Sequence, residues 1–175
     1  NFISNVTFEY LFVNGGSSVI FNATATVTTI FGYGKNNSVK NNDRFNIPRL
    51  NVSNFTFYKN GILNISDNTI NILDEGVLEI QSGALNLSNL WIKSGGILTH
   101  AANLSGLNIT AYNITIEYGG TINLTSKGYA STIGPGAGVS ITDGSTNDLG
   151  AGGGGYGGNG GNGNTMAGGT AYGSL

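Results

Sequence analysis

The sequence lacks cysteine, holds a single histidine and carries few charges of either sign. Without cysteine, neither disulfides nor thiolate metal sites are available. Seven basic and nine acidic residues give a net charge of −2, and no basic run is present to bind phosphates. Nucleic acid and anionic membranes are therefore poor partners. No apolar run reaches the roughly 18 residues that a membrane helix needs, so we expect no membrane span.

Polarity comes from uncharged residues and, we predict, from sugars. Charged residues make up 9 % of the chain, against roughly 25 % in ordinary soluble domains. N-x-Ser/Thr glycosylation sequences are more frequent than a shuffled chain of this composition would give. The predicted sites are Asn5, Asn22, Asn36, Asn51, Asn54, Asn64, Asn86, Asn103, Asn108, Asn113 and Asn123. Since modified asparagines require a eukaryote-type secretory route, we expect a secreted, extracellular or cell-surface glycoprotein. The alternative is that some of these sequences are accidental, because Asn and Thr suit the turns and stacks of a β-solenoid.

The chain has two regions of different composition. Residues 1–129 alternate apolar and polar side chains in short runs, which is the period of half-buried strands. Residues 130–175 contain 17 of the 30 glycines. We therefore predict a β-solenoid domain over 1–129 and a glycine-rich segment over 130–175. The GGN repeat at 157–162 suits extended, polyglycine-like strands joined by backbone hydrogen bonds, and a flexible linker is the alternative.

Internal repetition points to the fold. Four segments are centred on Gly61, Gly76, Gly96 and Gly120, with a strand expected on each side of the glycine. Side chains at −6, −4, +2 and +4 from each glycine should share the inner face, because alternate residues of a strand point the same way. These positions hold Phe55, Phe57, Leu63 and Ile65; Ile70, Ile72, Leu78 and Ile80; Leu90, Ile92, Leu98 and His100; Ile114, Ile116, Ile122 and Leu124. A weaker copy around Gly16 places Tyr10, Phe12 and Ile20 inward.

The repeated glycines predict an all-β, parallel β-helix (β-solenoid). Their spacings are 15, 20 and 24 residues, and such irregular intervals suit coils with loops inserted at the corners. An antiparallel sandwich is the main rival, since its strands also alternate. Aliphatic residues at a fixed offset from glycine favour the solenoid.

The chain resembles the large secreted right-handed β-helix proteins, that is, the pectin-lyase-like and adhesin-like repeat families with glycine-rich insertions. The resemblance covers roughly residues 54–175 and is carried by the run ITIEYGGTINLTSKGYASTIGPGAGVS, followed by GAGGGGYGGNGG and TAYGS. It implies architecture rather than activity. Pectin-cleaving members use groups of Asp on one sheet, and here no acid recurs at one position of neighbouring repeats. The residues that match Glu117 are Tyr58, Leu73 and Lys93.

The chemistry of the chain argues against an enzyme. His100 is the only histidine and lies at a core position, which favours a structural role. Asp74 and Glu75 are adjacent, so a solvated turn fits them better than an acid/base pair. The glycine run matches GxGxxG without a following helix, so it predicts no nucleotide site. We predict no catalytic residues, no cofactor and no metal site.

These features predict a structural glycoprotein that associates with copies of itself into a coat or fibre, because the end coils of a solenoid expose unpaired strand edges. The alternative is a carbohydrate-binding or cell-surface adhesin, with Trp91, Tyr58 and Tyr118 as a stacking strip. A polysaccharide lyase or hydrolase is less favoured. An ice-binding array is suggested only by Thr24, Thr26 and Thr28, and no neighbouring coil repeats that ladder.

Overall fold

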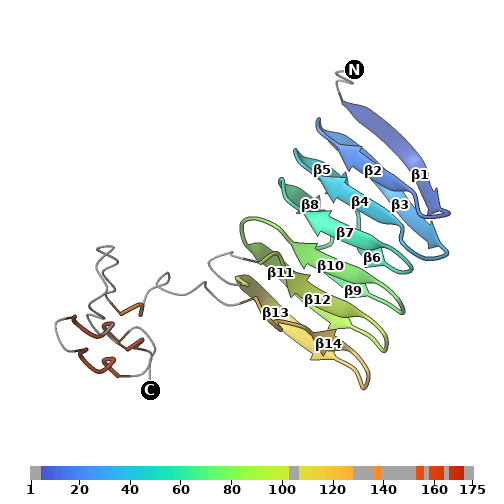
Figure 1. Cartoon of the computed structure of the whole chain (residues 1–175). Coiled ribbons are helices and arrows are strands. Elements are labelled where there is room, and N and C mark those ends of the chain that lie inside the picture. The colour runs from blue at the N-terminus through green and yellow to red at the C-terminus, as the bar shows by residue number, and fades with distance from the viewer. Residues whose placement is uncertain are drawn as a thin grey trace. The chain divides into compact units, whose positions relative to one another are not determined.

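The computed structural model describes residues 5–102, 107–127, 136–138, 153–155, 158–163 and 166–171. The chain divides into two compact units, residues 1–128 and 129–175. The first unit is a parallel β-solenoid of about six turns, as the sequence predicts (Figure 1). Every strand pair in it is parallel.

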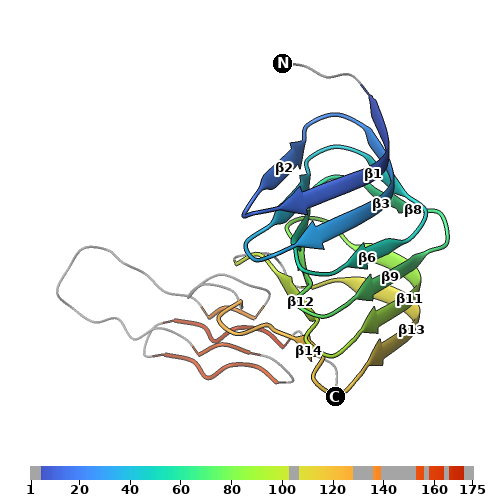
Figure 2. The ribbon, with the colours of Figure 1, turned by 90° about the vertical axis from the view of Figure 1, so that its right-hand side faces the viewer.

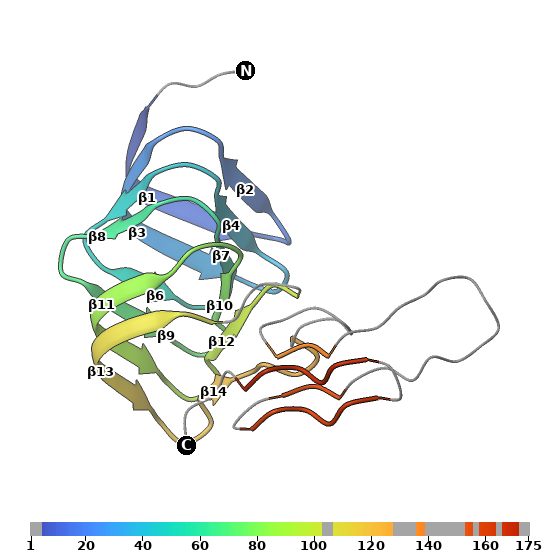
Figure 3. The same cartoon turned by 90° about the vertical axis from the view of Figure 1, so that its left-hand side faces the viewer.

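Three parallel sheets form the walls of the solenoid: sheet B has six strands, and sheets A and C have four each (Figures 2 and 3). Sheet A holds β1 (Val6–Asn14), β3 (Ala25–Tyr33), β5 (Phe45–Ile47) and β8 (Leu63–Ile65). Sheet B holds β2 (Ser18–Phe21), β4 (Ser38–Asn41), β7 (Thr56–Lys59), β10 (Val77–Ile80), β12 (Ile97–His100) and β14 (Thr121–Ile122). Sheet C holds β6 (Leu50–Val52), β9 (Thr69–Ile72), β11 (Leu85–Ile92) and β13 (Ile109–Ile116).

The core is a set of columns in which one residue per coil points inward. In sheet C, Val52, Ile72 and Ile92 pair in register and are fully buried. In sheet B, Phe57, Leu78 and Leu98 form a second such column. Because parallel in-register pairing places like side chains above one another, the interior is dry along its length.

One corner of the coil requires glycine because neighbouring coils approach closely there. Gly96 and Gly120 lie between a sheet C strand and a sheet B strand, and a Cβ at either would lie 2.5 Å from a carbonyl oxygen of the preceding coil, that of Ile72 or Ile92 respectively. Gly76 has the same place in its own coil. Three of the four predicted glycine-centred segments therefore share one register.

The register predicted for the segment around Gly61 is wrong. Gly61 follows β7 of sheet B, so it lies at a different corner from Gly76. Phe57 pairs with Leu78, whereas the predicted alignment matched it with Ile72. Alternation is the same on all three sheets, so a glycine between two alternating strands does not identify its corner.

The inward positions predicted for the copy around Gly16 are also wrong, because Tyr10, Phe12 and Ile20 are exposed. Ser18 pairs with Ser38, and through Thr56 with Val77, so Ser17 rather than Gly16 corresponds to Gly76. A slip of one residue exchanges the two faces of a strand. Val13 and Phe21 are the residues that point inward.

The last coil leaves its inner residues uncovered. Ile114 and Ile116 pair with Leu90 and Ile92 of sheet C, yet 49 % and 48 % of their surface is exposed. Ile122 and Leu124 are exposed as well. The sequence predicts all four as core because they continue the buried columns. These four side chains are exposed instead, because no coil of the described solenoid stacks beyond β13 and β14.

Backbone hydrogen bonds join the described glycine-rich stretches of the second unit. The N–H of Gly153 donates to Gly161 (2.9 Å), that of Gly160 to Gly169 (2.8 Å) and that of Gly169 to Gly153 (2.8 Å). Gly155 donates to Gly136 (2.8 Å). These contacts between separate stretches are what a bundle of extended strands requires. The bundle over the whole 130–175 segment stays a prediction, since much of it lies outside the described residues.

Close packing of these stretches gives a test with matched variants. A Cβ at Gly160 or Gly168 would overlap a backbone carbonyl of a neighbouring stretch, whereas Gly158 and Gly161 have no atom within 4 Å of theirs. We expect the double variant Gly160→Ala/Gly168→Ala to reduce amide hydrogen-exchange protection at Gly169 by at least about ten-fold. Gly158→Ala/Gly161→Ala should preserve it. Equal, fast exchange in both variants and in the unchanged chain would indicate a flexible linker.

Candidate functional site

Nine of the eleven predicted glycosylation sites are exposed on the described part of the solenoid. Of the eleven asparagines, Asn103 lies outside the described residues. Asn54 is half-buried, and the nine exposed asparagines are Asn5, Asn22, Asn36, Asn51, Asn64, Asn86, Asn108, Asn113 and Asn123. This exposure is compatible with a glycan at each of the nine, because a modified asparagine requires space in water. Whether the sites carry glycans stays a prediction.

Four of these exposed asparagines belong to ladders that join successive coils. Asn42 donates its Nδ2 to Asn22 (2.7 Å), and Asn60 in turn donates to Asn42 (3.0 Å). Asn64 donates to Asn46 (2.8 Å) in the same way. Two further pairs are Asn71 with Asn51 (2.7 Å) and Asn113 with Asn89 (3.1 Å). In every pair the later coil donates to the earlier one.

Two asparagines have a different role and are buried at corners. Asn37 donates to the carbonyl oxygens of Tyr33 (2.8 Å) and Gly34 (2.9 Å) and accepts from the N–H of Gly16 (3.0 Å). Asn41 accepts from the N–H of Asn60 and donates to a carbonyl of the following coil. They satisfy backbone groups that the turns leave without ladder partners. The sequence analysis assigned no role to Asn37 or Asn41. Neither of them is the acceptor asparagine of a glycosylation sequence.

A shallow groove of about 480 Å³ runs over the outer face of sheet C. Its floor comes from outward residues of β6, β9 and β11, and Trp91, 39 % exposed, supplies the only indole of the chain. The lining residues are Arg49, Asn51, Thr69, Asn71, Leu73, Asn89, Trp91 and Lys93. An aromatic face beside amides and cations is the composition that a sugar-binding surface uses.

The two basic side chains that line this groove form ion pairs with acidic residues that do not line it. Arg49 Nε lies 2.6 Å from Asp67 Oδ2, and Lys93 Nζ lies 3.9 Å from Glu117 Oε1. Lys93 also lies over the Trp91 ring, 5.3 Å from its centroid. All four charged side chains are substantially exposed, so these ion pairs contribute little to folding stability.

The predicted stacking strip of Trp91, Tyr58 and Tyr118 is wrong as a single strip. Trp91 points outward from sheet C, Tyr58 belongs to sheet B, and Tyr118 lies in the turn after β13. Aromatic rings gather elsewhere, at the amino-terminal end of the solenoid. Phe12 stacks on Phe31 with 5.1 Å between centroids, and Tyr10 and Tyr33 adjoin this pair.

The residues considered as catalytic candidates, His100 and the pair Asp74 and Glu75, lie in different parts of the coil. His100 is buried at the end of β12, and its Nδ1 lies 2.7 Å from the carbonyl oxygen of Ala101. Asp74 and Glu75 are exposed in the turn before β10. Within the described ranges, no three His, Cys, Asp or Glu side chains are grouped in a way that could hold a metal ion.

The described residues include no helix with the length and apolarity to cross a membrane. Comparison of the chain with protein-family models, curated proteins and solved structures gives no match. The repeat architecture of a parallel β-solenoid is therefore the level at which the chain resembles known β-helix proteins.

Glycosylation at the exposed asparagines is directly measurable. We expect mass spectrometry of the chain secreted from eukaryotic cells to find N-glycans on Asn22 and Asn86, because both are exposed acceptors. Thr24→Ala and Ser88→Ala should remove the two modifications individually. Asn42 is the internal control, since it is also exposed and belongs to the Asn22 ladder but is followed by Asp43 and Arg44. A peptide mass unchanged by glycosidase at both sites would contradict the prediction.

Proposed function

We propose that the chain is a structural, N-glycosylated extracellular protein that associates with copies of itself into a coat or fibre. The observation that carries this proposal is the pair of strand edges left without a partner at the two ends of the described solenoid. Within the described residues, β1 pairs only with β3, and β13 pairs only with β11. An open edge presents backbone N–H and C=O groups that favour pairing with another strand.

The strands at the two ends of the described solenoid have similar lengths. β1 has nine residues and β13 has eight, so either edge can hydrogen-bond along nearly the full length of the other. β1 is assigned to sheet A, but its second half pairs with the part of β3 that also contacts β6 of sheet C. All strands run parallel, so this half of β1 in a second copy would continue the sheet C ladder beyond β13. Such head-to-tail contacts use two different surfaces and generate an open filament when the rotation does not close.

Apolar burial supports the same arrangement. Ile114 and Ile116 occupy the buried columns of sheet C but remain half-exposed at the last coil. Covering them would gain roughly 25 cal/mol for each Å² of apolar surface removed from water. The first coil offers Phe8, an exposed side chain paired in register with the buried Val27. A second copy stacked in register would cover both surfaces.

The proposed extracellular location and the absence of enzymatic activity rest on other residues. Exposed glycosylation sequences cover the lateral walls, where glycans would oppose side-to-side aggregation. The acids of the described walls lie apart, without the grouped carboxylates that pectin-cleaving β-helix enzymes use. We therefore propose kinship with secreted right-handed β-helix glycoproteins of structural or adhesive type, rather than with their enzymatic members.

Electron microscopy and analytical ultracentrifugation test the assembly. We expect the purified chain to form filaments, and Ile114→Asp/Ile116→Asp to leave monomers, because burying two carboxylate groups at each contact would be unfavourable. The matched control is Tyr112→Asp, which places a carboxylate on the same strand at a side chain that is 90 % exposed, preserves the Asn113 glycosylation sequence and should preserve filaments. A monodisperse monomer at high concentration, both with glycans and after deglycosylation, would overturn the proposal.

A second candidate function is carbohydrate binding, which the groove over sheet C favours. Trp91 offers a ring face, and Asn51, Asn71 and Asn89 line the same surface with amide groups. If this candidate holds, a glycan array will show saturable binding that Trp91→Ala reduces at least about ten-fold, since stacking on an exposed indole contributes much of such affinity. Tyr118→Ala is the control, because Tyr118 is fully exposed in a turn. Equal binding by both variants would exclude the groove.

A further inference from the structure

The wall of the solenoid is interrupted between the fourth and fifth coils. Sheet A ends at β8, and the first half of β11 pairs with β13 on its one side without a ladder to β8 on the other. Hydrogen bonding between these two coils resumes at Asn68, whose carbonyl oxygen accepts from the N–H groups of Ser88 (2.8 Å) and Asn89 (3.1 Å). The backbone ladder of this wall is therefore open between β8 and the first half of β11.

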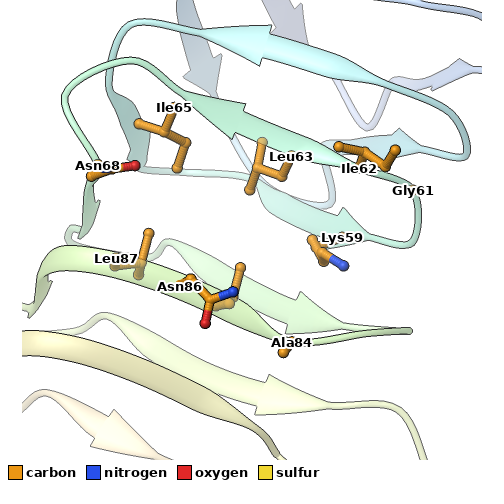
Figure 4. A pocket seen from close by; sticks show the side chains of 10 residues that line it. Lys59, Gly61, Ile62, Leu63, Ile65, Asn68, Ala84, Asn86 and Leu87 are labelled. Atoms are coloured by element: carbon orange, nitrogen blue, oxygen red, sulfur yellow. The ribbon is translucent and has the colours of Figure 1, made fainter.

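A cavity of about 240 Å³ lies at the interruption. Figure 4 shows Leu63 and Ile65 of β8 on one side and Ala84 and Leu87 on the other, with Lys59 between the two coils. Most of the lining side chains are aliphatic. The polar side chains that line it are Lys59, Asn68 and Asn86.

Lys59 is a buried basic residue without an acidic partner among the described residues. It continues the inward alternation of Phe55 and Phe57 and is only 6 % exposed. Its Nζ donates to the carbonyl oxygen of Ser82 (2.6 Å), which uses one of its three protons. The two ion pairs among the described residues are Arg49 with Asp67 and Lys93 with Glu117, and neither includes Lys59. Burial lowers the pKa of Lys59, because desolvation penalises its charged form.

The structural task of Lys59 does not require a charge. Its neighbour in the preceding coil is Asn41, which pairs with it in register and donates to the carbonyl of Ile62 (3.2 Å) at the corresponding corner. A neutral amide thus satisfies that corner carbonyl. The next coil has Ile80 at this position. What Lys59 adds is a positive charge at the edge of an apolar cavity, and a buried charge is unfavourable unless it is paired.

We propose that this cavity binds a short-chain aliphatic carboxylate. The carboxylate group pairs with the Lys59 ammonium, and the hydrocarbon tail lies against Leu63, Ile65 and Leu87. This site is independent of self-association, since it opens on the side wall of the solenoid.

Calorimetric titration of the full chain with hexanoate tests the site, with Ser88→Ala as the background that removes the Asn86 glycosylation sequence but preserves its amide. We expect one saturable site per chain, with hexan-1-ol at least about ten-fold weaker and hexylammonium not binding, because the charge pair supplies much of the affinity. Lys59→Met should reduce hexanoate affinity at least about ten-fold. Lys93→Met, which changes an exposed lysine, should preserve it.

A second variant keeps the test independent of the stability of Lys59→Met. Ala84→Phe changes an exposed residue of the cavity rim and should block binding while Lys59 remains in place. Circular dichroism and thermal unfolding confirm that each variant is folded. The proposal is overturned if hexanoate shows no saturable binding to the unchanged cavity, or if folded Lys59→Met or Ala84→Phe binds it as tightly.

Discussion

The fold depends on parallel, in-register pairing between successive coils. This pairing aligns Val52, Ile72 and Ile92 in one column and Phe57, Leu78 and Leu98 in another, so each coil supplies the surface that buries the next. A single coil could not bury its inner face alone. The dry interior therefore follows from repetition, and it explains how a chain without disulfides and with few charges can be compact.

Corners limit how the repeat can vary. At one corner the coils approach so closely that Gly96 and Gly120 leave no room for a side chain. At others, buried asparagines such as Asn37 and Asn41 bind backbone groups that have no ladder partner. Where the wall lacks such continuity, between β8 and β11, the cavity beside Lys59 appears. The strands thus provide stability, and the connections between them provide the local chemistry.

The sequence predicts the architecture better than its details. Fixed aliphatic offsets from Gly76, Gly96 and Gly120 identify the solenoid, because like residues recur on one face. The frames around Gly61 and Gly16 are wrong, since alternation alone does not identify a corner and a one-residue slip exchanges faces. The inward position of Lys59 could have been inferred from its alternation with Phe55 and Phe57. The interrupted wall beside it depends on pairing between coils, which a single sequence does not reveal.

The asparagine ladders have a consequence for the symmetry of the surface. Because Asn42, Asn60, Asn64, Asn71 and Asn113 all donate toward the amino-terminal coil, their amide dipoles are aligned along the solenoid axis. The outer wall therefore has an electric polarity along the solenoid axis even though it carries little net charge. A molecule travelling or lying along this wall would meet a different arrangement of partial charges in each orientation.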